Sequence, residues 1–245
     1  MKKIIFLFIF LPFIVFSQSI SDFFPTNNGQ LVNHTYYSLS YSEEHEQAEW
    51  VFYEIKKERI LSVAKRKNNF RSDKKISTYS STLLDYKGSG YDRGHLAPAK
   101  DFSFNTIAMS ESFYMSNMSP QHPSFNRGIW KKLESLVRSW GAKSSVYVVT
   151  GPVLDDCSVT IGANNVCVPK YYYKVIYDVI DQKMISFLLP NVKGTKNLNE
   201  YVCTTDSLEK ITSIDFFQIL DDDLENKIES EIHKELWTGL LSSKK

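Results

Sequence analysis

A short run near the middle of the chain, residues 91–98, holds side chains that could hydrolyse a phosphodiester bond. It reads Tyr-Asp-Arg-Gly-His-Leu-Ala-Pro and places a proton acceptor, His95, two residues after a permanent cation, Arg93. Such hydrolysis needs a base that takes a proton from water and a cation that stabilises the phosphoryl charge. Histidine titrates nearest to neutral pH, and arginine can clamp a phosphate oxygen. We expect Gly94 to allow a backbone conformation that a side chain would resist. We expect Asp92 to orient the ring of His95 or to anchor the turn.

A second dense block follows about thirty residues later and could supply a metal site. It includes Ser-Asn-Met-Ser-Pro-Gln at 116–121 and an asparagine, Asn126, just before a helical pattern. Glu134 and Arg138 lie about two and three turns further on, so all three can project from one helix face. An amide oxygen with water molecules suits a hard divalent ion such as Mg2+, and a nearby carboxylate could hold those waters. The two blocks therefore read as halves of one hydrolytic site.

Each residue also has an ordinary explanation when it is taken alone. Asn126 before a helix is most often a cap, and Glu134 with Arg138 would usually be a surface pair one turn apart. A single Asp-Arg-Gly-His tetrapeptide is weak evidence for catalysis. The catalytic interpretation depends on the combination of these residues in this order.

The segments around the two blocks predict an α+β fold. Residues 127–140 carry apolar side chains at three- and four-residue spacing, which indicates an amphipathic helix with Gly141 as its C-terminal cap. A second helical pattern covers residues 224–241. Aromatic and β-branched runs predict strands at 36–41, 49–55, 146–150, 171–179 and 184–189. Strands and helices mix without a regular βαβ rhythm, which favours α+β.

The first residues have the pattern of a secretory signal peptide. Two lysines precede an apolar stretch, residues 4–16, and Val15 and Ser17 suit cleavage before Gln18. The stretch is shorter than the roughly 20 residues that a membrane span needs. We therefore expect residues 1–17 to be removed, leaving one domain, 18–245, that is secreted or periplasmic and has no stable membrane association.

Charge and cysteine content constrain this expected mature chain. It would carry 27 basic and 28 acidic side chains, so any attraction to nucleic acid must come from a local patch. Export would place the three cysteines in an oxidising compartment. Cys157 and Cys167 flank a turn at 162–165 and are the natural pair, although either could instead pair with Cys203 or none could pair.

A polar segment between residues 65 and 75 concentrates positive charge. Its six basic residues are Lys65, Arg66, Lys67, Arg71, Lys74 and Lys75. Such a run could attract phosphates, or it could be a solvated loop.

The ordered motifs resemble those of the DNA/RNA non-specific endonucleases of the ββα-metal superfamily, which includes Serratia-type secreted nucleases and endonuclease G. The resemblance rests on Asp-Arg-Gly-His-x-Ala-Pro, then Asn-x-x-Pro-Gln, then Asn-x-Gly-x-Trp-x-x-Leu-Glu, between residues 91 and 138. It implies a central, mostly antiparallel sheet flanked by helices. It also implies a secreted, Mg2+-dependent enzyme that cuts DNA and RNA to 5′-phosphate products, with Mn2+ or another divalent ion as a substitute.

The resemblance also implies roles for individual residues. His95 is the general base, Asn126 is the sole direct protein ligand of the metal, and Glu134 orders metal-bound water. Arg93 and Arg138 stabilise the phosphate. The expected substrate-binding residues are Arg93, Asn117, Gln121, Arg127 and Arg138. A further arginine of the family has either Arg66 or Arg71 as its counterpart here.

Two other functions remain open from the sequence. One is an inactive extracellular module that binds nucleic acid on the same fold, and the other is a phosphodiesterase for small nucleotides. The resemblance also allows a homodimer, although the sequence indicates no interface.

Overall fold

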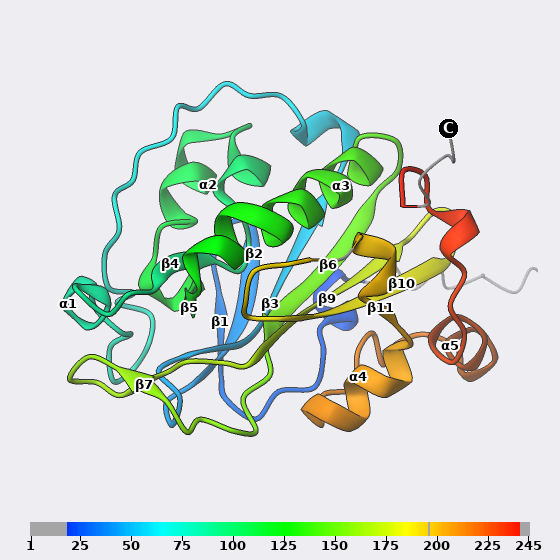
Figure 1. Ribbon diagram of the computed structural model, residues 1–245. Coiled ribbons are helices and arrows are strands. Elements are labelled where there is room, and N and C mark those ends of the chain that lie inside the picture. Colours follow the sequence, from blue (N-terminus) through cyan, green and yellow to red (C-terminus); the bar gives the residue numbers. More distant parts are fainter. Residues whose placement is uncertain (1–18, 196, 241–245) are drawn as a thin grey trace, which may run out of the picture.

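The computed structural model describes residues 19–195 and 197–240, and its centre is one antiparallel sheet (Figure 1). The expected signal peptide, residues 1–17, lies outside the described residues. Seven strands form the sheet in the order β1-β2-β3-β6-β9-β10-β11. They are β1 Gln30–Asn33, β2 Tyr37–Ser42, β3 Gln47–Ile55, β6 Val146–Pro152, β9 Tyr171–Asp178, β10 Lys183–Pro190 and β11 Val202–Cys203. All neighbouring pairs are antiparallel, which confirms the expected sheet and the five predicted strands.

Helices cover both faces of this sheet because its strands alternate apolar side chains on two sides. In β3, Val51 and Tyr53 face one core, whereas Trp50 and Phe52 face the other. The first core lies under α3, Lys131–Gly141, and beside α2, Thr106–Glu111. The second core is covered by α4, Thr205–Thr212, and α5, Asp222–Glu229. No helix in the described ranges is long and apolar enough to cross a membrane.

Smaller elements complete the fold. Two short strands, β4 Asp92–His95 and β5 Met118–Gln121, pair with each other apart from the large sheet. A second small pair is β7 Thr160–Ile161 with β8 Val166–Cys167, and α1 spans Leu83–Tyr86. A disulfide joins Cys157 to Cys167, which confirms the expected pairing, and Cys203 is half-buried and unbridged.

The helix predicted over 127–140 is present but not continuous. A π-helical turn, Phe125–Trp130, precedes α3, and Gly128 within it has non-helical angles, φ −106° and ψ −107°. The prediction that Gly141 is the cap was wrong, because Gly141 is the last helical residue and Ala142 follows as the cap. A Cβ at Gly141 would lie 2.3 Å from Cγ2 of Ile55, so close packing on β3 explains this glycine.

The second predicted helix, 224–241, was wrong in length. The structure ends α5 at Glu229 and has only a short 3-10 turn at Lys234–Leu236. Ile228 packs in the core beneath α4, whereas Trp237 packs in the core beneath α3, where its ring lies 4.6 Å from that of Trp140. One straight helix cannot reach both faces of the sheet, so the chain must break between these two residues.

Candidate active site

The β4–β5 pair fixes the first half of the predicted site. His95 ends β4 opposite Met118, and Asp92 begins it opposite Gln121. A Cβ on Gly94 would lie 2.2 Å from the side-chain oxygen of Gln121, so this position requires glycine for space. The expectation that Gly94 is needed for an unusual backbone conformation is therefore replaced by a packing reason.

His95 lies in an enclosed, partly aromatic environment. The rings of Phe70 and Phe113 pack edge-on against it at centroid distances of 5.8 Å and 4.9 Å, and Nε2 is buried without a hydrogen-bond partner in the described ranges. Burial and the positive charges of Arg66 and Arg93 lower the pKa of His95 to about 3. The imidazole is therefore neutral near pH 7 and can accept a proton.

Asp92 holds the second half of the site against the first. Its Oδ2 atom accepts a hydrogen bond from Nδ2 of Asn126 at 2.8 Å and one from Nε of Arg127 at 2.9 Å. Arg127 adds an ion pair to Oδ1 of Asp92 at 2.6 Å. Asp92 thus orients the asparagine rather than the ring of His95, and Oδ1 of the same amide remains available as an acceptor.

A buried set of charges supports α3 beneath the site. Arg138 forms an ion pair with buried Asp101 through Nε. Lys174, on β9, is fully buried, and its Nζ atom lies 4.7 Å from the ring centre of Trp130 without a hydrogen bond in the described part of the chain. Loss of solvation raises the pKa of Glu134, and the positive charge of Lys174 opposes this rise. Lys174 therefore favours the ionised form of Glu134.

These residues surround one cavity of about 320 Å³. The lining includes His95, Asn126, Glu134 and six basic residues, namely Arg66, Arg93, Lys100, Arg127, Lys131 and Arg138. Glu134 is the one acidic residue of this lining. The whole chain has almost no net charge, but six of its basic side chains gather at this cavity, where they would attract phosphate groups.

The structure also separates the two arginines that the sequence left as alternatives. Arg66 lines the cavity, and its guanidinium lies 4.9 Å from the ring centre of Phe113. Arg71 instead donates to the carbonyl oxygens of Asn69 and Ser110 and does not line the cavity. Arg66 is therefore the arginine placed at the site.

Asn117 and Gln121 lie behind the cavity rather than on its surface. Both are fully buried. Asn117 accepts a hydrogen bond from the Ala97 nitrogen and donates to the carbonyl oxygens of Ala97 and Ser112, each at 2.9 Å. It therefore fixes the chain just after His95. Asn117 therefore supports the backbone, and Gln121 packs against Gly94, with both polar atoms of its side chain buried and without a hydrogen-bond partner in the described residues.

Lys174 and Asp101 were not anticipated from the sequence. Lys174 was overlooked within a predicted strand, although its position carried a signal. In β9 it shares a face with Tyr172 and Ile176, both of which are buried in the core beneath α3. A lysine on the same strand face as core residues must either pair with opposite charges or change its pKa. The alternation of side chains along the strand could therefore have marked Lys174 as a buried charge.

We predict that Arg66→Gln raises the pKa of His95. The substitution removes one of the two cations that disfavour the imidazolium. The ring resonance of His95, assigned by its loss in His95→Ala, would be followed by NMR across the acid range. Arg71→Gln is the matched control because Arg71 does not line the cavity. An equal rise in both variants, or none in Arg66→Gln, would contradict the charge coupling.

Comparisons with known proteins agree with this geometry. Mitochondrial nuclease EXOG of Mus musculus is 33% identical over 219 residues, which cover 81% of this chain and 60% of the relative. Nuclease C1 of Cunninghamella echinulata var. echinulata is 37% identical over 205 residues, covering 76% and 81% of the two chains. Mitochondrial endonuclease G of Homo sapiens is 32% identical over 210 residues, covering 76% and 69%.

A solved structure supports the same relationship. A chain in the crystal structure of the EndoG/EndoGI complex superposes with a TM-score of 0.75 at 33% identity, covering 82% of this chain and 91% of that one. This chain spans about 60% of the length of the EXOG relatives that it matches. Residues 17–223 match the DNA/RNA non-specific endonuclease family. On the matched motifs, the fold and these relatives, the chain belongs to the DNA/RNA non-specific endonuclease family.

Proposed function

We propose that this chain is a divalent-metal-dependent endonuclease that hydrolyses phosphodiester bonds in DNA and RNA and leaves 5′-phosphates. The observation that carries the proposal is the cavity in which a neutral His95 and the free oxygen of Asn126 lie among six basic side chains. Membership of the nuclease family supports the same reaction class.

His95 takes the proton from the attacking water in this proposal. Its neutral ring is ready to do so before substrate binds, because burial, with the positive charges of Arg66 and Arg93, disfavours its protonated form. A bound phosphate would neutralise part of that positive charge and raise the basicity of the ring. The same two arginines would then hold the phosphate and lower the barrier to nucleophilic attack.

The residues at Asn126 fit a hard divalent ion. The bond from Nδ2 to Asp92 fixes the amide, so its oxygen is available to a cation of the Mg2+ class. Half-buried Glu134 lines the same cavity and could hold water around such an ion. When bound there, the ion would supply positive charge to the oxygen that leaves the phosphorus. Mg2+ is the proposed ion, and Mn2+ is an expected substitute.

An open, basic hollow favours a polymer over a small nucleotide. The cavity shares Arg66, Ala99 and Lys100 with a neighbouring hollow that continues toward Lys65 and Ser62. Basic side chains along such a path can follow successive phosphates without reading base edges, which accounts for low sequence preference and predicts weaker binding in high salt.

We expect the mature chain to cleave both plasmid DNA and RNA with Mg2+ and to lose this activity in EDTA. His95→Ala should lower the cleavage rate by about 10²–10⁴-fold because the proton acceptor is removed. Asn126→Ala should raise the Mg2+ concentration needed for half-maximal rate. Gel assays with both polymers, and a dinucleotide for comparison, measure these effects.

His122→Ala is the control for these variants, since His122 is exposed and bonded to Ser124 on the loop before α3. Wild-type rates in His95→Ala would exclude the base assignment. Cleavage that is unaffected by EDTA would exclude the metal requirement, and faster turnover of the dinucleotide would favour the small-nucleotide alternative. Binding of polymers without any cleavage would favour the inactive module.

We expect Lys174→Met to move the acid limb of the activity profile to higher pH. The substitution removes the buried cation that lowers the pKa of Glu134, so the carboxylate ionises only at higher pH. The pH dependence of kcat/KM reports the free enzyme. Lys170→Met is the control because Lys170 is exposed and pairs with Asp156 just before the same strand. A uniform loss of rate without a shifted limb would indicate a packing role alone.

We also propose that the chain is exported. The support is the signal-like pattern before Gln18 and the disulfide between Cys157 and Cys167, a bond typical of oxidising compartments. We expect mass spectrometry of the expressed full chain to find a mature N-terminus at Gln18 in the periplasm or medium. An intact N-terminus inside the cell would exclude this proposal.

A further inference from the structure

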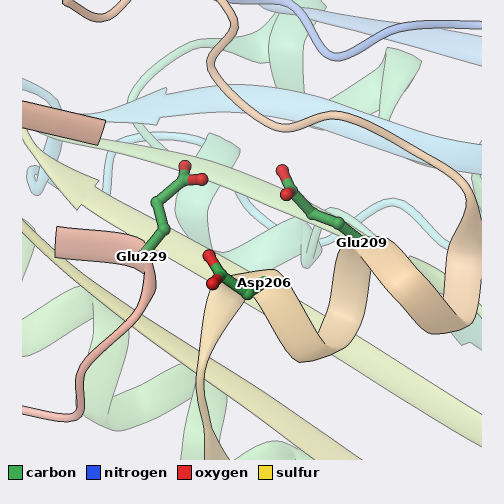
Figure 2. A group of neighbouring side chains, drawn as sticks. All are labelled: Asp206, Glu209 and Glu229. Atoms are coloured by element: carbon green, nitrogen blue, oxygen red, sulfur yellow. The ribbon is translucent and has the colours of Figure 1, made fainter. Parts of the chain in front are cut away.

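Three carboxylates meet between α4 and α5, on the face of the sheet opposite to the basic cavity (Figure 2). One oxygen each from Asp206, Glu209 and Glu229 lies within 4.8 Å of the others. Asp206 and Glu209 are three residues apart on α4 and so share one side of that helix. Glu229 is the last residue of α5 and points toward them.

Glu229 distinguishes this cluster from an ordinary acidic surface. Its side chain is only 2% exposed, and its Oε1 atom has no hydrogen-bond partner among residues 19–195 and 197–240. A buried carboxylate without a partner is costly, and such groups in folded proteins are usually paired or bind a metal. Figure 2 shows its carboxylate close to those of Asp206 and Glu209.

The surroundings of Glu229 are strongly acidic. Burial and the charges of Glu209, Glu225, Asp206 and Asp215 raise its pKa to about 9. None of these five acids forms an ion pair within the described part of the chain. No ion pair within the described residues therefore balances the charge of this acidic group, and a bound cation would supply the missing positive charge.

We propose that Asp206, Glu209 and Glu229 bind one hard divalent cation, with Ca2+ preferred. Carboxylate oxygens are the ligands that such ions favour, and Ca2+ accepts six to eight of them in irregular arrangements. Mg2+ is usually held by only one or two carboxylates and keeps several water molecules. A group of three carboxylates within 4.8 Å of one another therefore suits Ca2+ better. Glu209 can contribute because only its Oε1 is engaged, by the Phe216 nitrogen at 2.9 Å.

This site is separate from the shared nuclease machinery. Asp206 and Glu209 lie within the family match, residues 17–223, whereas Glu229 lies beyond it. The cluster also lies against the core that contains Leu208 and Ile228, away from the core beneath α3. A bound ion would join α4 to α5, so it would stabilise the C-terminal part of the fold by mass action.

Calcium binding and thermal unfolding of the full mature chain test the proposal. Asn126→Ala serves as the background, so that an ion at the basic cavity does not contribute. We expect one Ca2+ per chain by titration calorimetry and a higher Tm in Ca2+ than in EDTA. Glu229→Gln should weaken Ca2+ binding by about tenfold or more and remove the calcium-dependent rise in Tm.

Glu229→Gln keeps the size and shape of the side chain and removes one negative charge from the acidic group, so its Tm in EDTA should not fall. Glu209→Gln, at a half-buried position, is a second variant with the same expected loss of binding. Glu231→Gln is the matched control, because Glu231 is an exposed acid two residues beyond Glu229. Unchanged Ca2+ binding in both cluster variants, or no Ca2+ binding in the Asn126→Ala background, would overturn the site. Tighter binding of Mg2+ than of Ca2+ would overturn the choice of ion.

Discussion

The bond between the Asp92 carboxylate and the Asn126 amide joins the two halves of the site. Asp92 belongs to β4 and Asn126 to the π-helical turn before α3, and 34 residues separate them in the chain. This contact helps to set the distance between His95, three residues after Asp92, and the side-chain oxygen of Asn126. The remaining features support it: Gln121 packs against Gly94, Asn117 fixes the chain after His95, and α3 rests on the buried charges below.

Nearby positive charges influence the protonation states of the site. Burial, together with the positive charges of Arg66 and Arg93, keeps His95 neutral, while buried Lys174 opposes the protonation of Glu134. Positive charge thus favours the neutral form of His95 and the ionised form of Glu134. A buried ion such as Lys174 rarely adds stability over an apolar residue of the same size, so its value lies in the protonation state that it favours at Glu134.

Much of this arrangement could be predicted from the sequence, and the features that could not be predicted have physical causes. The strands and α3 were predictable because alternation and helical spacing reflect burial on one face. The break of the C-terminal helix was not predictable, because it results from Ile228 and Trp237 entering cores on opposite faces of the sheet. The sequence could not show whether Arg66 or Arg71 lines the cavity, because hydrogen bonds to Ser110 hold Arg71 away from it. The effect of Lys174 on Glu134 depends on side chains that β3 and α3 bring close to it in the fold.

The opposed placement of the basic cavity and the acidic α4–α5 cluster has a consequence for encounter with a charged polymer. The two groups of charge have opposite sign and lie on opposite faces of the sheet. A polyanion is attracted by the basic group and repelled by the acidic group. This arrangement of charge therefore favours approach of a polyanion from the side of the cavity.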